Sequence, residues 1–122
     1  MTTILLLIAV AVFFLAMGIY ALLAPAALAR PFRITIDTPE ARSEIRAVNG
    51  GFGLAIAAIL IVAALNVGDL RTGMVLTVAA ALAGMALGRL LSRLTDKPTP
   101  FYPVWFYFCV EAVGAALLVT AA

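Results

Sequence analysis

Glu111 is the residue whose type and position point most directly to chemistry. It lies in an apolar run from Phe101 to Ala122, ten residues after the run begins. That is about 15 Å along a helix, near the middle of a bilayer. An ionised carboxylate at that depth costs about 2.5–3.5 kcal/mol. Glu111 is therefore expected to point into the protein, where it pairs with a cation or stays protonated.

Two arginines are within reach of Glu111. Arg89, near the end of the third apolar run, and Arg46, near the start of the second, lie about 9 and 10 Å from the same membrane surface. Their long side chains could meet Glu111 by pointing down the bundle. Two arginines and one carboxylate would leave a pocket with net positive charge. Such a pocket favours an anionic or carbonyl head group held by guanidinium groups.

Three further polar residues are expected near the same layer. Asn49 lies about 15 Å deep on the second run, level with Glu111, and Tyr20 lies about 7.5 Å deep on the first. Tyr107 shares a helical face with Glu111. We therefore expect a ligand-binding site made of Tyr20, Arg46, Asn49, Arg89, Tyr107 and Glu111. The alternative is that Arg89 and Glu111 form a buried ion pair that only sets the helix register.

Catalytic and metal chemistry have little support in the sequence. There is no histidine, and Cys109 is the single cysteine, so the usual haem, copper and catalytic zinc ligand sets are missing. We expect no resident cofactor, no metal and no catalytic residue. The one imaginable reaction is a proton transfer or isomerisation centred on Glu111. A formal net charge of +2, scattered along the chain, excludes a nucleic-acid surface.

The elements that must position these residues are membrane-spanning helices. The 122 residues are 66% hydrophobic and 11% charged, with a mean hydropathy of +1.18, which excludes an ordinary soluble domain. The apolar runs predict an all-α four-helix membrane bundle, with residues 1–122 forming a single transmembrane domain. Its spans are expected at residues 4–24, 39–65, 70–94 and 101–122.

Prolines, turn residues and glycines divide the runs. Residues 25–39 are expected to form an irregular basic connector that ends in a helix start at Thr38 and Pro39. Residues 66–69 predict a turn, and residues 95–100 a second connector. Two small-residue tracts predict places where membrane helices approach closely. They are Gly50, Gly51 and Gly53 in the second span, and Gly84-x-x-x-Gly88 in the third.

The first run has one alternative interpretation, as a signal peptide. Ala27-Leu28-Ala29 resembles a signal-peptidase site. However, no Lys or Arg precedes the run, and the run is longer than a typical signal core. We expect it to be a retained spanning helix.

Basic residues predict the orientation of the chain. Seven of the eight Lys and Arg residues are toward the two connectors, and Arg71 is alone on the opposite side. The positive-inside rule therefore places both connectors in the cytoplasm. In a bacterial inner membrane, this puts both termini in the periplasm.

Three short motifs carry a resemblance to a known family. At Arg46-Ala47-Val48-Asn49-Gly50-Gly51, Gly88-Arg89-Leu90-Leu91-Ser92 and Glu111-Ala112, the sequence resembles the bacterial membrane family catalogued as domain of unknown function 4345. The resemblance covers nearly the whole chain. It implies a four-helix membrane fold and nominates Arg46, Arg89 and Glu111, but it supplies no activity. A weaker likeness to DoxX-type proteins concerns the fold alone.

The sequence departs from that family's pattern at two places. Asp96-Lys97-Pro98 lacks the connector glycine, which changes the expected turn type of this loop. Asn49 stands where an aromatic residue is common, so the pocket is more polar than the family pattern implies.

Three functions are compatible with these features. The first is a binding module that holds an amphipathic molecule, such as a lipid, quinone or isoprenoid, with its head at the polar layer. The second is a small proton-coupled transporter acting as a homodimer. The third is an accessory subunit of a larger membrane complex. In each case the protein is embedded in the lipid bilayer.

Overall fold

The computed structural model describes residues 1–122 and is built of helices without strands. Four helical segments are long and apolar enough to cross a membrane. They are Thr2–Leu23, Pro39–Ala64, Arg71–Thr95 and Phe101–Ala121. The all-α four-helix fold is therefore confirmed, and every expected boundary lies within two residues of the observed one. Hydropathy located these spans because each must match the thickness of the hydrocarbon core.

Short helices join or interrupt the long ones. The first span is α1 (Thr2–Leu23), and the third is α5 (Arg71–Thr95). The second span comprises α3 (Pro39–Ile45), the π-helix η2 (Arg46–Gly51) and α4 (Phe52–Ala64). The fourth comprises η4 (Phe101–Trp105) and α6 (Phe106–Ala121). The remaining elements are α2 (Pro25–Ala29), η1 (Arg30–Phe32) and η3 (Val67–Asp69).

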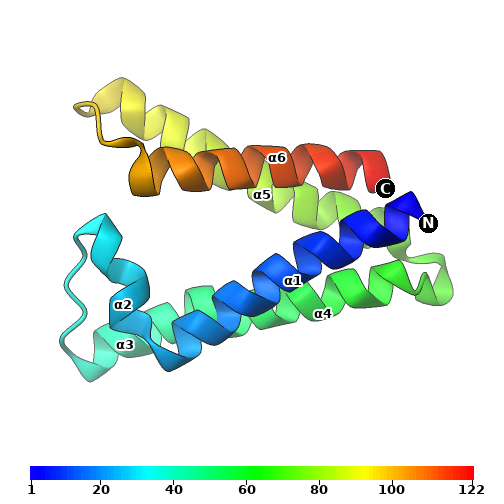
Figure 1. Ribbon diagram of the computed structural model, residues 1–122, viewed down its shortest axis with the longest axis horizontal. Coiled ribbons are helices and arrows are strands. Elements are labelled where there is room, and N and C mark those ends of the chain that lie inside the picture. Colours follow the sequence, from blue (N-terminus) through cyan, green and yellow to red (C-terminus); the bar gives the residue numbers. More distant parts are fainter.

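The helices form two antiparallel pairs. Figure 1 shows α1 running along α4 and α5 running along α6, and these are the closest pairings in the molecule. Fewer contacts join the two pairs, between α1 and α6 and between α4 and α5. The pairs lie close together near the chain termini and splay apart toward the connectors (Figure 1). We call these the terminal end and the connector end.

The packed core lies toward the terminal end. Each long helix contributes one large side chain that is almost completely buried. These four are Leu7 of α1, Leu60 of α4, Val75 of α5 and Leu118 of α6. In a bilayer the lipid tails are as apolar as these side chains, so close packing rather than water exclusion holds the helices together. The two pairs are therefore interlocked at the terminal end.

Glycines bring α1 against the second span. A Cβ atom on Gly53 would lie 3.3 Å from the Cα of Gly18, and one on Gly50 would lie 2.7 Å from the Cδ2 atom of Leu22. The prediction is confirmed for Gly50 and Gly53, with Gly18 as their partner on α1, whereas Gly51 approaches no other helix. The prediction for Gly84 and Gly88 is wrong, because nothing lies within 4 Å of a Cβ at either position.

The buried face of α5 explains why its glycines stay exposed. That helix packs through Val75, Val78, Ala79, Leu82 and Ala86, which follow one another at helical spacing. Gly84 and Gly88 each lie two residues beyond a member of this face, so they point away from it. A Gly-x-x-x-Gly pattern therefore does not mark the contact surface in this helix.

The first connector is more ordered than its prolines suggest. Residues 25–39 were expected to be irregular, but α2 and η1 make residues 25–32 helical. Pro25 occupies the first turn of α2, where its missing N–H costs nothing. Leu28 and Ala29 are buried, so this short helix packs against its neighbours. The expected helix start is confirmed, because the Thr38 Oγ1 accepts a hydrogen bond from the Ala41 N–H at 3.1 Å.

The expected turn at residues 66–69 is stabilised by an arginine. Gly68 has φ +62°, a conformation that glycine adopts without strain. The Arg71 Nε and Nη2 atoms donate hydrogen bonds to the carbonyl oxygens of Ala63 and Ala64, both at 2.8 Å. Arg71 therefore bonds to two carbonyls in the last turn of α4, and the Ala63 carbonyl also accepts from the Asn66 N–H at 3.0 Å.

Candidate functional site

Glu111 and Arg89 form a bidentate ion pair between α6 and α5. The Arg89 Nε donates to Glu111 Oε1 at 2.8 Å, and Arg89 Nη2 donates to Oε2 at 2.8 Å. Glu111 is only 3% exposed, whereas the Arg89 side chain is 22% exposed. Parallel hydrogen bonds of this kind fix geometry and neutralise the carboxylate. The expectation that Glu111 points into the bundle and meets a cation is confirmed.

Aromatic rings hold the guanidinium group of Arg89. Its Cζ atom lies 5.8 Å from the ring centre of Phe32 and 5.7 Å from that of Tyr107. The two rings are themselves 5.5 Å apart. Cation–π contacts at this distance stabilise the position of the cation. We call Phe32, Arg89 and Tyr107 the aromatic clamp, and it links the first connector to the α5/α6 pair.

Phe32 is the site residue that sequence reasoning missed. It belongs to η1, in a connector, so no helical periodicity placed it near Arg89. The contact depends on the path of the chain after α1, which brings η1 against η4. No local pattern in the sequence signals such a contact.

Arg46 does not reach Glu111. Its Nε atom donates a hydrogen bond to the carbonyl oxygen of Leu22 at 3.1 Å. Leu22 lies in the last turn of α1, where carbonyl groups lack partners within the helix and attract cations. Arg46 therefore caps α1 and adds no positive charge to the ion pair. Tyr20 is likewise exposed and does not join the pair.

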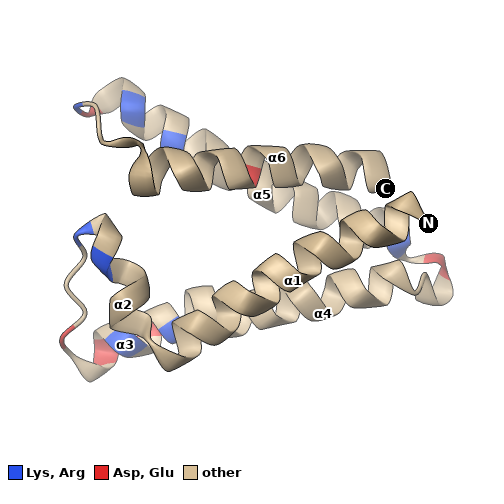
Figure 2. Cartoon of the chain, viewed as in Figure 1, with Lys and Arg blue, Asp and Glu red and all other residues tan.

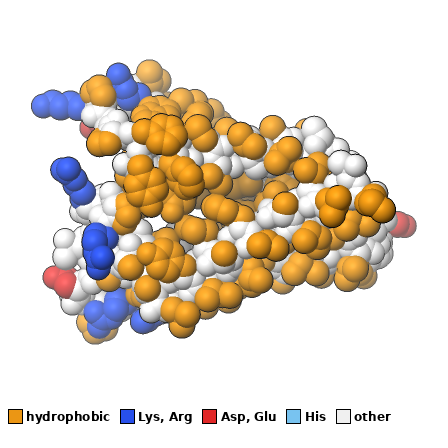
Figure 3. All heavy atoms as spheres, in the orientation of Figure 1, with side chains coloured by type: hydrophobic (Ala, Val, Ile, Leu, Met, Phe, Trp, Pro, Cys, Tyr) orange, Lys and Arg blue, Asp and Glu red, His pale blue; other side chains and the backbone are white.

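A groove of about 850 Å³ lies between the two helix pairs. Of the 18 residues that line it, 14 are hydrophobic, and the other four are Asn49, Gly53, Glu111 and Gly114. Figure 3 shows apolar side chains on both sides of the hollow between the pairs. The volume falls within the range of about 300–1,000 Å³ typical of small-molecule sites. Of the six predicted residues, Asn49 and Glu111 line this groove, while Arg89 binds Glu111 and Tyr107 contacts Arg89.

The groove lies between the packed core and the aromatic clamp. On α1 it extends from Ala9 to Met17, which is about 12 Å at 1.5 Å per residue. The packed core lies at the terminal end, and the aromatic clamp lies about one turn beyond the groove at the connector end. Lining residues such as Phe52, Met85 and Val113 are exposed, so the groove is accessible from outside the protein.

A π-helical turn separates Asn49 from Arg46. These residues are three apart, so they would share a face on an α-helix. The wider turn of η2 rotates them further apart, and Arg46 bonds to α1 while Asn49 lines the groove. Turns of this type occur frequently at functional sites. The Arg-Ala-Val-Asn-Gly-Gly motif coincides with η2.

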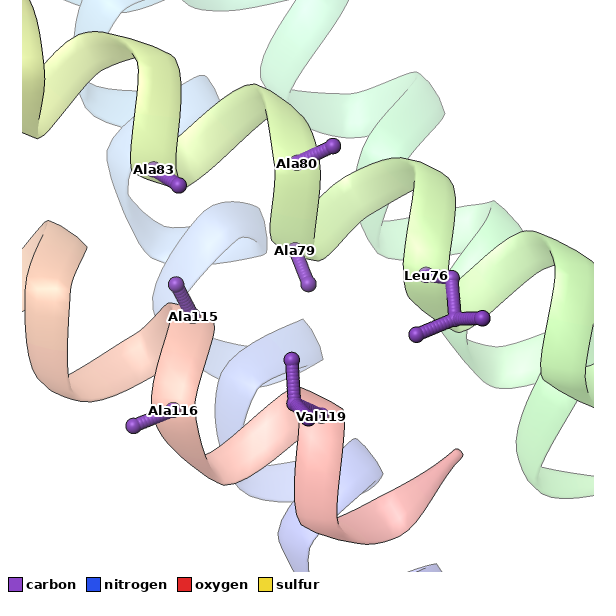
Figure 4. Close-up of a pocket in the computed structure, with 7 residues that line it drawn as sticks. All are labelled: Leu76, Ala79, Ala80, Ala83, Ala115, Ala116 and Val119. Atoms are coloured by element: carbon purple, nitrogen blue, oxygen red, sulfur yellow. The ribbon is translucent and has the colours of Figure 1, made fainter.

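A second, shallower depression lies between α5 and α6. Its volume is about 540 Å³, and all seven lining residues are hydrophobic. Figure 4 shows Ala79, Ala115 and Val119 pointing into the space between the helices, with Ala80 and Ala116 pointing away from it. With no polar side chain among its lining residues, this depression offers no group that could recognise a polar head.

The geometry of the ion pair does not favour acid–base chemistry at Glu111. Both carboxylate oxygens of Glu111 accept hydrogen bonds from Arg89, so the group is not free to act as a base. The four long apolar helices and the groove between them define a small multi-pass helical membrane protein.

The chain belongs to the family described as a domain of unknown function, DUF4345, whose sequence model matches residues 2–122. The resemblance drawn from the three motifs is confirmed. A search of curated proteins found no match, and neither did a search of solved structures. The family description names no activity, so the function must be argued from the groove.

Proposed function

We propose that the protein binds an amphipathic small molecule, such as a lipid, quinone or isoprenoid, in the groove between its helix pairs. The observation that carries this proposal is the groove itself, about 850 Å³ in volume and lined by 14 hydrophobic residues out of 18. Asn49 and Glu111 supply polar groups on its walls. An apolar pocket with a few polar groups is the usual form of a small-molecule site.

The openings of the groove favour a ligand that arrives through the bilayer. The aromatic clamp lies between the groove and the connector end, and in a bilayer the sides of the bundle would face the lipid. The groove extends for about 12 Å, compared with a hydrocarbon core of about 30 Å. A long tail would therefore leave through a side opening and continue among the lipid chains.

A proton-coupled transporter is the weaker alternative. Such a mechanism needs a membrane carboxylate that exchanges its proton with a substrate. Glu111 instead has both oxygens bound by Arg89 at 2.8 Å. The third alternative is an accessory role in a larger complex. In the binding experiment below, it would appear as a co-purifying second protein without a bound small molecule.

We also propose a bacterial inner-membrane location with the connectors in the cytoplasm and both termini in the periplasm. Figure 2 shows Lys and Arg residues gathered at the connector end of the molecule. The positive-inside rule relates this distribution to the cytoplasmic side.

A pair of neighbouring alanines provides a matched test of the binding proposal. Ala81 lines the groove, whereas Ala80 lines only the shallow depression, and both are exposed on α5. Ala81→Trp should fill the groove and reduce the amount of co-purifying small molecule, while Ala80→Trp should leave that amount unchanged. Native mass spectrometry of the purified proteins measures bound molecules, and thermal melting checks that both variants fold.

Two results would contradict the proposal. Equal ligand content in the wild type and both variants would show that the bound molecule is outside the groove. Absence of any bound molecule, together with a co-purifying second protein, would favour the accessory-subunit function.

A further inference from the structure

The charged groups at the groove limit which head groups a bound ligand can carry. Glu111 is the only ionisable side chain that lines the groove, and Arg89 matches its charge through two hydrogen bonds. Arg46 bonds to the Leu22 carbonyl instead. The net positive pocket expected from the sequence is therefore not formed. An anionic head entering this groove would lie near a carboxylate, without a free arginine to neutralise it.

Asn49 is the polar group in the groove that lacks a partner. Its side chain forms none of the hydrogen bonds in the structure. It lies ten residues after Pro39, and Glu111 lies ten residues after Phe101. Both are thus about 15 Å from the connector end of their spans. An amide without a partner at that depth is costly, because lipid tails offer no hydrogen bonds.

We infer that the groove selects a ligand with an uncharged oxygen head, an alcohol or a carbonyl, that hydrogen-bonds to the Asn49 amide. This inference rests on the proposed function and deepens it by naming the ligand class. The amide both donates and accepts, so it matches a hydroxyl group or a carbonyl oxygen. Molecules of this class include prenyl alcohols and quinones. Phosphate and carboxylate heads are excluded, because their dehydration is not repaid in a groove that no arginine lines and whose nearest arginine, Arg89, is already paired.

Three probes that share a prenyl tail and differ at the head distinguish the contribution of the head group to affinity from that of the tail. They are farnesol, farnesyl phosphate and the hydrocarbon farnesene. Their affinities are measured by equilibrium binding of radiolabelled probe to the full chain in phosphatidylcholine nanodiscs. For the wild type we expect farnesol to bind about two- to tenfold more tightly than farnesene, the value of one neutral hydrogen bond. Farnesyl phosphate should bind at least about tenfold more weakly than farnesol.

Two variants assign the effect to Asn49. In Asn49→Leu the preference for farnesol over farnesene should disappear, while farnesene itself still binds. Because Asn49 is exposed on the surface of the chain, this substitution should not prevent folding, and thermal melting verifies that. The control is Thr77→Val on α5, which also removes a polar group from a span but lies outside the groove. It should retain the wild-type preference.

The outcomes distinguish failure of the inference from failure of the proposed function. Farnesyl phosphate binding as tightly as farnesol would overturn the uncharged head. Equal binding of farnesol and farnesene to the wild type would overturn the role of Asn49 but leave the apolar groove as a site. If Ala81→Trp reduces the binding of none of the probes that the wild type binds, both the inference and the proposed function are wrong.

Discussion

Replacing the two members of the ion pair, singly and together, tests whether Arg89 and Glu111 act as a unit. Removing one partner of a fully buried pair costs about 3–5 kcal/mol, because the other charge is left without compensation. The Arg89 side chain is 22% exposed, so the pair is not fully buried and a smaller effect is expected. We expect Arg89→Gln to lower the free energy of unfolding by about 2–3 kcal/mol.

The other two variants complete the cycle. Glu111→Gln keeps an oxygen that accepts one hydrogen bond from Arg89, so the expected loss is about 1–2 kcal/mol. In the double variant the two amides can hydrogen-bond to each other, and the total loss should again be about 1–2 kcal/mol. The sum of the single losses exceeds the double loss, which gives a coupling free energy of about 2 kcal/mol.

Unfolding by sodium dodecyl sulfate in mixed micelles, followed by far-ultraviolet circular dichroism, measures these values. Independent sites add to within about 0.5 kcal/mol. A coupling free energy below that value would therefore refute the conclusion that the two hydrogen bonds form one unit. Ligand content of the same samples separates stability from binding. A clear stability loss with unaltered bound ligand in both single variants would assign the pair a structural role only.

Three other predictions concern orientation, packing and the aromatic clamp. In a cysteine-free background, Thr35→Cys and Thr99→Cys should react with a thiol reagent only from the cytoplasm, and labelling of either from the periplasm would reverse the orientation. Gly53→Leu should lower the free energy of unfolding by about 1–3 kcal/mol by forcing α1 away, whereas Gly84→Leu should change it by less than about 0.5 kcal/mol. Phe32→Ala should lower the free energy of unfolding by about 1 kcal/mol, because the cation–π contact with Arg89 is lost. A denaturant titration measures this change, and an unchanged midpoint would show that the contact does not stabilise the protein.

The spans and the ion pair were predictable because each follows from a large energetic cost. Charge-free apolar segments of bilayer length leave few alternatives to spanning helices, and a carboxylate in mid-span requires a partner. Arg89 met that requirement through two hydrogen bonds to Glu111. The glycines of the second span were also informative, since η2 and α4 do pack closely against α1.

Features that depend on competition between partners were not predictable. Arg46 is at a suitable depth for Glu111, but the chain turns at Ala24 and leaves the Leu22 carbonyl available nearby. Helical spacing alone does not show whether Arg46 bonds to Glu111 or to the Leu22 carbonyl. The same limit applies to Phe32, whose contact with Arg89 depends on the folding of an entire connector.

The aromatic clamp and the packed core together govern how wide the groove can be. At the terminal end, separating the pairs would pull apart Leu7, Leu60 and Leu118, which are almost fully enclosed. At the connector end, separation breaks mainly the ring contacts of Phe32, each worth about 1 kcal/mol. The molecule therefore has a stiff end and a compliant end, and a bulkier occupant would be accommodated by opening the connector end first. The strength of one aromatic contact in a connector thus limits the size of molecule that the membrane-embedded groove can hold.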